Sequence, residues 1–394
     1  MKKGWQTNTL GEIGKISMCK RIFKEETTAT GDIPFYKIGT FGKEPDAFIP
    51  NQTYNEYRSK YPFPKKGDVL ISASGTIGRR VRYDGEPAYF QDSNIVWIVN
   101  DEKQVLNDYL YYFYGACEWN STKGSTISRL YNDDLRRIAI GFPESLAEQQ
   151  RIVGLLDDAF EGLATAKANA EKNLQNARAL FESHLQSVFT QRGNGWVEKR
   201  KPLSDLCDLI VDCEHKTAPT QEHGIPSIRT PNIGKGKLLL DGVNRVSEET
   251  YKNWTRRAEP MPKDLILARE APAGNVAVIP ENMKVCLGQR TVLIRPKVSI
   301  FDSSFLAFLL LEPKTQAKLL AHSRGATVQH VNMKDIRALD VGAIPPLEVQ
   351  QSIVSTLGDL EAETQRLARI YERKLAALAE LKKSLLHQAF TGEL

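Results

Sequence analysis

Two stretches of the chain, residues 146–192 and 347–394, share one pattern of hydrophobic and polar positions. In each stretch, apolar or small residues recur at spacings that alternate between three and four, as along the seam of a coiled coil. Neither stretch contains an internal proline, whereas Pro143 and Pro345-Pro346 stand just before them, where a helix can begin. We therefore predict two helices of about 40 residues, each roughly 60 Å long. The predicted contact positions, here called the helix seam, are Ile152, Leu156, Leu163, Leu174, Phe181, Leu185, Ile353, Leu357, Leu360, Leu367, Leu375, Leu378 and Leu386.

A single amphipathic helix of this length would be expected to pack against its own globular domain. Two equivalent helices, each following an equivalent segment, more naturally pack on each other, because so long a seam needs a partner of matching length. We therefore predict that residues 146–192 and 347–394 form a helix pair.

The two remaining segments, residues 1–145 and 193–346, alternate short β-rich runs with turns that contain glycine or proline. The expected fold class is α+β, with two similar domains, each a small mixed sheet with helices, joined by the two long helices. Buried strands are predicted at residues 69–71, 94–99, 264–268 and 291–294, and helices at residues 106–119 and 305–320.

The chain contains an internal repeat. Gly67-Asp68-Val69-Leu70-Ile71 corresponds to Lys263-Asp264-Leu265-Ile266-Leu267 at an offset of 196, and Glu148-Gln149-Gln150 corresponds to Val349-Gln350-Gln351 at an offset of 201. The offset drifts in the globular segments and is steady in the helices, because loops accept insertions and packed helices do not. The predicted organisation is a domain at 1–145, a helix at 146–192, a second domain at 193–346 and a second helix at 347–394.

The composition is that of an ordinary globular protein, with 41% hydrophobic and 26% charged residues. The 394 residues exceed the usual size of a single core and imply two or more domains. Because no run of about 18 apolar residues is present and the N-terminus turns polar at once, we expect neither a membrane helix nor a signal peptide. The five scattered cysteines suit reduced thiols, so a cytoplasmic protein is expected.

The net charge of +5 is mild, but it is unevenly distributed. Segments 1–145 and 193–346 carry surpluses of two and five basic side chains, whereas each long helix carries one more acidic than basic side chain. Such surpluses are compatible with DNA binding and do not by themselves establish it.

Catalytic and metal-binding motifs are missing from the sequence. Gly75-Thr76-Ile77-Gly78-Arg79 lacks the Gly-Lys-Ser/Thr ending of a phosphate-binding loop, and there is no Gly-x-Gly-x-x-Gly nucleotide loop. Cys207, Cys213, His215 and His223 are close in sequence, but their spacing matches no zinc pattern. We therefore expect no cofactor, no metal and no catalytic residue.

The repeated motifs resemble those of the specificity subunits of type I restriction–modification enzymes. One is the strand Gly67-Asp68-Val69-Leu70-Ile71 followed by Gly75-Thr76-Ile77-Gly78-Arg79 and Gln91. The other is an entry of the Pro-x-x-x-Glu-Gln-Gln type to a long helix that ends in Phe-Thr-Gly. It stands here as Pro143, Glu148-Gln149-Gln150 and Phe189-Thr190-Gln191, and again as Pro346, Gln350-Gln351 and Phe390-Thr391-Gly392. The order, the duplication and the length of the chain carry the resemblance over essentially all of the sequence.

The resemblance implies a non-catalytic subunit with two target-recognition domains, each reading one half of a bipartite, asymmetric site on double-stranded DNA. The two helices would pair antiparallel and act as a ruler between the half-sites. Two methyltransferase (modification) subunits would dock on this scaffold, and motor–nuclease (restriction) subunits would join the complex. Lys263 and Ala271-Pro272-Ala273-Gly274 replace Gly67 and Gly75-Thr76-Ile77-Gly78, which indicates that the two domains read different sequences.

Candidate DNA contacts are basic and amide side chains on or near the turns between strands. Arginine and lysine can bridge guanine O6 and N7, and glutamine and asparagine can bridge adenine N6 and N7, although most protein–DNA hydrogen bonds go to phosphates. The candidates are Lys20, Arg21, Lys37, Lys43, Arg79, Arg80, Arg82, Gln91, Lys216, Arg229, Asn232, Lys235, Lys237, Arg269, Gln289 and Arg290.

Two other classes of function remain open. A coiled-coil scaffold without DNA recognition would have neutral domain surfaces, and the arginines and lysines clustered on turns speak against it. A nuclease would need carboxylates or histidines that converge in a pocket, and the sequence shows no such cluster. The aromatic run from Tyr109 to Tyr114 could stack bases, but its helical spacing favours a place in a domain core.

Overall fold

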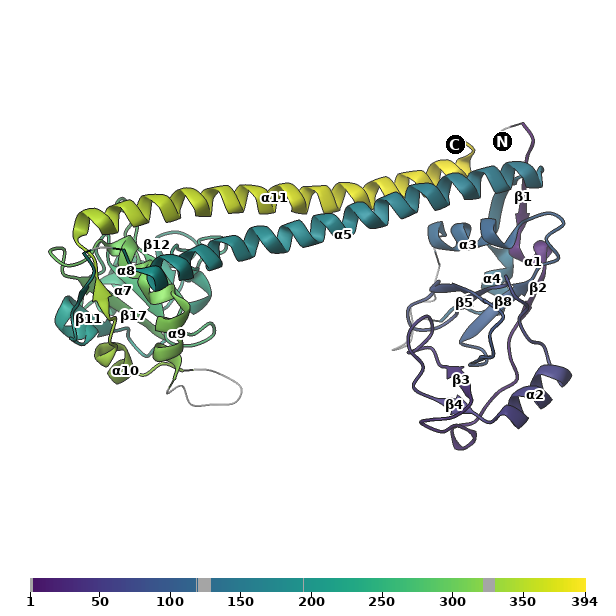
Figure 1. The fold of residues 1–394 in the computed structure, drawn as a ribbon, viewed down its shortest axis with the longest axis horizontal. Coiled ribbons are helices and arrows are strands. Elements are labelled where there is room, and N and C mark those ends of the chain that lie inside the picture. Colours follow the sequence, from purple (N-terminus) through teal and green to yellow (C-terminus); the bar gives the residue numbers. More distant parts are fainter. Residues whose placement is uncertain (1–2, 118, 120–128, 194, 322–329) are drawn as a thin grey trace. The chain divides into compact units, whose positions relative to one another are not determined.

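Two helices dominate the fold of this chain. The computed structural model describes residues 3–117, 119, 129–193, 195–321 and 330–394 (Figure 1). Helix α5 spans Leu146–Gln191 and helix α11 spans Leu347–Thr391, where the sequence predicts the two long helices. None of the helices in the described part of the chain has both the length and the apolar sequence that crossing a membrane requires.

The chain divides into two compact units, and each long helix contributes to both. Unit 1 consists of Met1–Lys172 with Glu372–Leu394, and unit 2 consists of Asn173–Tyr371. Each unit therefore holds a globular domain, the start of the long helix that follows it and the end of the other long helix. The four sequential segments predicted above stay a prediction, since the two units cut across the helices.

The domain of unit 1 is built from short strands and helices. In chain order they are β1 (Trp5–Thr9), α1 (Leu10–Ile13), β2 (Lys15–Ser17), the 3-10 turn η1 (Lys24–Glu26), β3 (Ile33–Tyr36), β4 (Phe48–Ile49), α2 (Asn51–Lys60), β5 (Val69–Ser72), β6 (Arg80–Arg82), β7 (Tyr89–Phe90), β8 (Ile95–Val99), α3 (Asn107–Ala116), α4 (Asn132–Arg137) and β9 (Ala139–Pro143). The sheet β2-β8-β5-β6 is antiparallel, β3 pairs with β4 and with β7, and β1 pairs with β9.

The domain of unit 2 contains the same three sheets as the domain of unit 1: one of four strands, one of three and one of two. They are β10 (Val197–Glu198), α6 (Leu203–Leu206), β11 (Cys207–Asp212), β12 (Ile225–Ile228), the 3-10 turn η2 (Thr230–Asn232), β13 (Arg245–Val246), α7 (Glu248–Trp254), β14 (Leu265–Ala268), β15 (Val276–Val278), β16 (Cys286–Leu287), β17 (Thr291–Pro296), α8 (Ser303–Leu311), α9 (Pro313–Leu320), α10 (Met333–Ala338) and β18 (Ala343–Ile344). The sheet β11-β17-β14-β15 is antiparallel, β12 pairs with β13 and with β16, and β10 pairs with β18.

The strand registers reproduce the sequence repeat. Leu70 of β5 lies opposite Trp97 of β8, and Ile266 of β14 lies opposite Leu293 of β17. Both members of the pair shift by the predicted offset of 196. The parallel pair of β3 with β7 likewise recurs as β12 with β16. The α+β class, the small mixed sheets and the internal duplication are therefore confirmed.

One predicted element is wrong as a single helix. Residues 305–320 form the end of α8 and all of α9, with a break at Glu312. Pro313 has no amide hydrogen to continue the helical ladder, and it stands at the first turn of α9, where none is needed. The Glu312 carboxylate accepts a hydrogen bond from the Thr315 amide at 2.7 Å and so caps the new helix.

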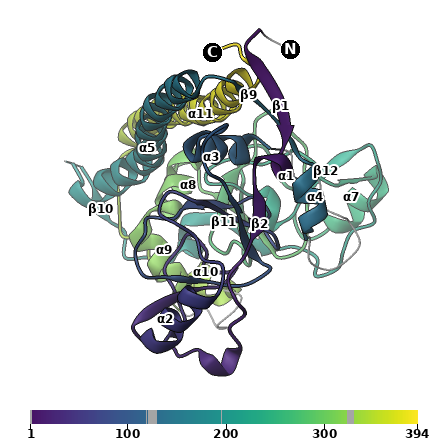
Figure 2. The same cartoon turned by 90° about the vertical axis from the view of Figure 1, so that its right-hand side faces the viewer.

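Within unit 1, the start of α5 and the end of α11 lie side by side (Figures 1 and 2). Arg151 donates a hydrogen bond to the Leu394 carbonyl at 3.1 Å, and Lys382 Nζ lies 4.9 Å from the ring centre of Phe160. Because the partner number falls as the number along α5 rises, the two segments run antiparallel, as the resemblance implies.

The helix seam is used in two ways. Near the helix ends, its side chains belong to the domain cores, and between them, its side chains are half-buried along the helices. The core of unit 1 contains Ile152, Leu156 and Leu386, and the core of unit 2 contains Leu185 and Leu357 with Phe181 and Ile353 packed against it. Leu163, Leu375 and Leu378 line a groove between the helices, and Leu174, Leu360 and Leu367 are half-buried. Each helix therefore packs both on the other helix and on the globular domains.

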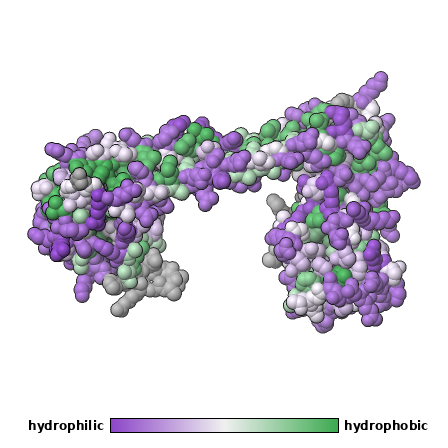
Figure 3. Space-filling view, in the orientation of Figure 1, coloured by the Kyte–Doolittle hydropathy of each residue, from purple (hydrophilic) through white to green (hydrophobic). Residues whose placement is uncertain are grey.

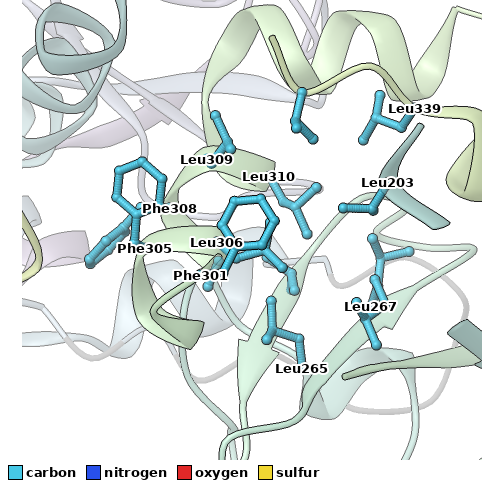
Figure 4. Packing of buried hydrophobic residues seen from close by; sticks show 14 of the residues in the cluster. Leu203, Leu265, Leu267, Phe301, Phe305, Leu306, Phe308, Leu309, Leu310 and Leu339 are labelled. Atoms are coloured by element: carbon cyan, nitrogen blue, oxygen red, sulfur yellow. The ribbon is translucent and has the colours of Figure 1, made fainter. Parts of the chain in front are cut away.

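The core of unit 2 shows this construction at close range. In Figure 4, phenylalanines and leucines of α8, among them Phe305 and Leu306, gather over Leu265 and Leu267 of β14. Phe189 of α5 lies 5.5 Å from Phe305 between ring centres. Since burial of such a side chain contributes roughly 1.5–3 kcal/mol, the long helices supply a substantial part of the stability of each core.

A buried glutamine fastens the start of each long helix to its domain. Gln149 Oε1 accepts from the Leu106 amide at 2.9 Å, and Gln149 Nε2 donates to the carbonyls of Gln104 and Pro143 at 2.7 and 2.9 Å. The Gln149 side chain is fully buried. Its amide oxygen and nitrogen satisfy three main-chain groups that take part in no hydrogen bond of a strand or helix.

Gln350 repeats the arrangement in unit 2. Its Oε1 accepts from the Asp302 amide at 2.8 Å, and its Nε2 donates to the carbonyls of Ile300 and Pro345 at 2.7 and 2.9 Å. Gln149 and Gln350 are separated by the offset of 201 found in the sequence. We call these two arrangements the glutamine clamps.

Loss of a clamp should destabilise the protein strongly. We expect Gln149→Ala and Gln350→Ala each to lower the free energy of unfolding by about 2–4 kcal/mol, because each strands buried main-chain groups without hydrogen bonds. Urea unfolding followed by circular dichroism measures the change. The matched controls Gln150→Ala and Gln351→Ala remove neighbouring exposed amides and should alter the stability little. Equal effects of clamp and control variants would contradict the assigned role.

Candidate nucleic-acid interface

The β5–β6 hairpin holds three of the candidate DNA contacts, Arg79 in the turn and Arg80 and Arg82 on β6, and all three have partners within the protein. Arg79 Nη1 donates to a main-chain carbonyl at 2.9 Å. The Arg80 and Arg82 guanidinium groups lie 4.5 and 3.9 Å from the ring centre of Tyr111, and Arg82 also pairs with Asp108 at 2.7 Å. Burial lowers the pKa of the Arg80 guanidinium. Arg80 and Arg82 therefore connect β6 to α3, whereas Arg79 holds the loop at Phe41.

Three further candidates of unit 1 are also engaged. Arg21 pairs with Asp92 at 2.8 Å, and Lys37 pairs with Asp46 at 2.8 Å. Gln91 Oε1 accepts from a main-chain amide at 3.0 Å, so its side chain holds a loop together. The ion pairs are exposed and can exchange a carboxylate partner for a phosphate at little cost. The Gln91 bond is part of the local fold.

The candidates on the loop after η2 connect the domain of unit 2 to the long helices. Lys235 Nζ lies 2.6 Å from a carboxylate oxygen of Glu182 on α5, and Lys237 Nζ lies 3.1 Å from one of Glu361 on α11. Asn232 donates to a main-chain carbonyl at 3.2 Å within the same loop. This loop thus packs toward the helix pair.

Four candidates are exposed cations for which the described residues provide no carboxylate partner. They are Lys20, Lys43, Lys216 and Arg229. Lys20 Nζ lies 5.1 Å from the ring centre of Tyr61, which leaves the charge accessible. Such side chains are the most readily available to DNA phosphates, since they need not give up another partner first.

The last three candidates meet in one polar cavity of unit 2. The cavity has a volume of about 220 Å³ and is lined by His215, Arg269, Glu270, Gln289, Arg290 and His330. Arg290 Nη1 lies 2.9 Å from Glu270 Oε2, and His330 Nδ1 lies 2.8 Å from Glu270 Oε1. We call Arg269, Glu270, Arg290 and His330 the Glu270 cluster.

The hydrogen bonds of the Glu270 cluster fix the tautomer of His330. Arg269 Nη2 lies 2.9 Å from His330 Nε2, and a guanidinium can only donate, so Nε2 is the acceptor. The ring hydrogen is therefore on Nδ1, from which it points to the Glu270 carboxylate. Arg269 also donates through Nε to the Val331 carbonyl at 3.0 Å. The cluster is a connected network that holds its carboxylate in one place.

Glu270 and His330 are the members that the sequence-based list misses. The list takes basic and amide side chains near glycine-rich turns, and Glu270 is acidic, although it directly precedes Ala271-Pro272-Ala273-Gly274. His330 is 60 residues away in sequence, and only strand pairing brings it to Glu270. Position in the repeat would have found Glu270, because it lies 196 residues after Ser74 at the same turn.

The cysteines and histidines do not assemble into a metal site in the part of the chain that is described. No group of three or more His, Cys, Asp or Glu side chains there could hold a metal ion. His215 pairs instead with Asp212 at 3.0 Å, and Cys207 and Cys213 are buried. Burial raises the pKa of the Cys19, Cys207 and Cys286 thiols to about 12. The thiolate is the nucleophilic form, so these three thiols have low reactivity at neutral pH.

Alkylation should reveal this difference among the cysteines. At pH 8 iodoacetamide should modify Cys117, which is only half-buried, and leave the buried Cys19, Cys207, Cys213 and Cys286 unmodified in the folded protein. Peptide mass spectrometry reads out each site, and the same reaction in denaturant, where all five should react, is the control. Rapid labelling of Cys207 or Cys286 in the folded protein would show a reactive thiol that burial does not protect.

The sequence matches a known family in two places. The model of the type I restriction modification DNA specificity domain matches residues 2–174 and again residues 196–372. A protein named as a type I restriction enzyme specificity subunit in Haemophilus influenzae is 56% identical over 179 residues, which are 44% of this chain and 46% of that protein. The specificity subunit of the type I restriction enzyme EcoBI from Escherichia coli is 24% identical over 297 residues, 70% of this chain and 62% of that subunit. The chain thus matches less than two thirds of the length of these two relatives.

Solved structures show the same fold. A chain from a structure of the type I R-M system, described for its complex assembly and conformational transition, has a TM-score of 0.74 at 19% identity, covering 100% of this chain and 99% of that one. The HsdS subunit from Thermoanaerobacter tengcongensis has a TM-score of 0.58 at 19% identity, covering 100% and 98%. At this identity the likeness concerns the fold, while the family model matches most of the sequence. The chain belongs to the family of type I restriction modification DNA specificity domains, of which it contains two copies.

Proposed function

We propose that this chain is the sequence-reading specificity subunit of a type I restriction–modification complex, and that each of its two domains reads one half of a bipartite, asymmetric DNA site. The observation that carries the proposal is the duplication of one domain with different side chains on it. Matching registers, such as Leu70 with Trp97 and Ile266 with Leu293, repeat the backbone. A duplicated fold that carries different polar side chains in its two copies suits a target whose two halves differ.

The long helices are proposed to set the gap between the half-sites and to dock the methyltransferase subunits. Paired helices are stiff compared with a flexible linker, so their length can fix a spacing. Several large apolar side chains lie exposed on them, among them Leu155, Leu180 and Leu381 with 44%, 50% and 48% of their surface accessible. On the face in Figure 3, apolar side chains likewise interrupt the hydrophilic surface of the helices. Apolar surface of this kind favours protein partners over water.

The chemistry of modification and restriction is assigned to the partners in this proposal. Two methyltransferase subunits would bind the helices and methylate the site that the specificity subunit selects, and motor–nuclease subunits would join for restriction. The chain itself would be non-catalytic. Its cytoplasmic location stays a prediction from the sequence.

The decisive experiment is co-expression with a methyltransferase subunit of a type I system from the same host, followed by mapping of methylated adenines in host DNA by single-molecule sequencing. A split motif, with two short defined halves around an unspecified gap, is the expected result. Co-purification without any methylated motif would count against a functional reader. Absence of both complex and methylation would favour the alternative of a coiled-coil scaffold that does not recognise DNA.

The exposed lysines without a carboxylate partner should contribute to the salt dependence of DNA binding. In the methyltransferase complex, Lys43→Ala and Lys216→Ala should each reduce the slope of log K against log salt concentration by about 0.9 if each lysine contacts one phosphate. Fluorescence anisotropy with a labelled duplex that carries the mapped motif measures the slope. Lys284→Ala is the control, because Lys284 is not among the candidate contacts and its ammonium group donates to both carboxylate oxygens of Glu248, and it should leave the slope unchanged. Equal slopes for all variants would show that the exposed lysines do not reach the backbone.

A further inference from the structure

We propose that Glu270 and Arg290 together read a G·C base pair in the half-site that belongs to the domain of unit 2. The inference rests on the proposed function and adds to it one base pair of the target and the two residues that read it. Among the described residues, the Glu270 cluster brings a carboxylate, two guanidinium groups and an imidazole around one cavity, where strand β14 ends and strand β17 begins.

The position of the pair suits a reader. Glu270 stands at the turn between β14 and β15, and Arg290 stands just before β17, in the left-handed region with φ of 64°. The Glu270 side chain is 18% exposed and the Arg290 side chain is 62% exposed, with 2.9 Å between the charged atoms. The Glu270 carboxylate is therefore fixed by its neighbours, whereas the Arg290 guanidinium is exposed and can contact a ligand.

The chemistry of the pair matches one base pair. In the major groove, guanine presents two acceptors, O6 and N7, and cytosine presents its N4 amino group as a donor. Arg290 can donate to both guanine atoms, and a Glu270 oxygen can accept from the cytosine amino group. An A·T pair offers no second purine acceptor for the guanidinium, so it fits less well.

A carboxylate at this place also speaks against a simple phosphate site. A negative side chain in the cavity repels a phosphate and offsets the attraction of the arginines. A base edge has a donor that a carboxylate can use. The mixed charge of the cavity therefore favours contact with bases over contact with the DNA backbone.

Arg269 and His330 act as positioning residues. His330 donates from Nδ1 to Glu270 Oε1 at 2.8 Å, and Arg269 holds His330 through Nε2 at 2.9 Å. One carboxylate oxygen is thus fixed, and the other, Oε2, is shared with Arg290. Gln289 lines the same cavity and makes no side-chain hydrogen bond within the described part of the chain, so its amide is available for a neighbouring base.

The same turn in unit 1 makes the same main-chain hydrogen bonds, although the left-handed residue is Ser93 there and Arg290 in unit 2. The Ala73 amide donates to the Asn94 carbonyl at 2.7 Å, and the Arg269 amide donates to the Arg290 carbonyl at 2.9 Å. In the next pair of bonds, Leu130 donates to Ala73 and Val331 donates to Arg269, both at 2.9 Å. Ser74, Asn94 and Arg129 therefore occupy the places of Glu270, Arg290 and His330.

The side chains at these matched places differ completely. In unit 1, Ser74 Oγ donates to Asn94 Oδ1 at 2.8 Å, where unit 2 has the ion pair of Glu270 with Arg290. Because the main-chain hydrogen bonds form equally well around both pairs, the ion pair is not needed to build the turn. A position that keeps its main-chain hydrogen bonds and exchanges its polar groups is what a reader of different bases requires.

The test measures base preference position by position. Duplexes carrying each of the four base pairs at every position of the mapped half-sites are methylated by the complex of wild-type, Glu270→Gln and Arg290→Gln chains. Each variant should lose roughly tenfold to a hundredfold discrimination at one G·C position in one half-site only, since one bidentate or charged base contact is removed. The control Glu281→Gln removes an exposed carboxylate that pairs with Lys263 in the same domain, and it should change no position.

A double variant keeps the test independent of folding. Glu270→Ser with Arg290→Asn carries the pair that unit 1 already supports with the same main-chain hydrogen bonds. It should still methylate and should no longer require G·C at that position, with the other half-site unchanged.

The outcomes separate this inference from the proposed function. If the wild-type complex yields no split motif, the proposed function fails and the inference with it. If the wild type reads a split motif and the variants at Glu270 and Arg290 keep every base preference, the inference is overturned and the function stands. A uniform loss across both half-sites would overturn it as well, because it would show a structural role.

Discussion

Each globular core of this protein is closed by side chains from the other half of the sequence, and this constraint governs the rest of the fold. Leu386 and Ala389 from the C-terminal end of α11 lie in the core of unit 1, beside Ile152 and Leu156 from the start of α5. Neither domain could bury its apolar surface fully with its own residues alone. The helices must therefore pair antiparallel, because only that arrangement brings the end of one helix to the start of the other.

The glutamine clamps make this arrangement specific. An apolar helix end can slide along a core, whereas Gln149 and Gln350 each join three main-chain groups by directional hydrogen bonds. A helix that shifted by one residue would leave those groups buried and unpaired, at a cost of several kcal/mol. The clamps thereby fix the register of α5 and α11 against their domains, while the apolar contacts supply most of the burial free energy.

The large features of the fold could be predicted because they depend on periodicity. The length of α5 and α11, the duplication and the four buried strands follow from spacing, glycine and proline positions and the offset of 196. The break between α8 and α9 was missed because it depends on Glu312 capping a helix at Pro313, a local event inside an apolar run. Periodicity also could not show that Leu185 and Leu386 serve domain cores, since a core and a partner helix demand the same residue types.

The site was harder to predict than the fold, because charge alone does not show what a side chain contacts. Arg80 and Arg82 look like free cations in the sequence, yet both lie over Tyr111. Glu270 looks unsuited to DNA, yet it lies between Arg290 and His330 in a cavity.

The repeat resolves the difficulty, because it provides an internal comparison that a single domain lacks. Side chains that differ at matched positions while the main-chain hydrogen bonds stay the same, such as Glu270 and Ser74, are not required to build the turn. Side chains that are the same in both domains, such as Gln350 and Gln149, stabilise the fold that the two domains share. Within one chain, the duplication thus distinguishes residues that both domains need from residues that differ between them.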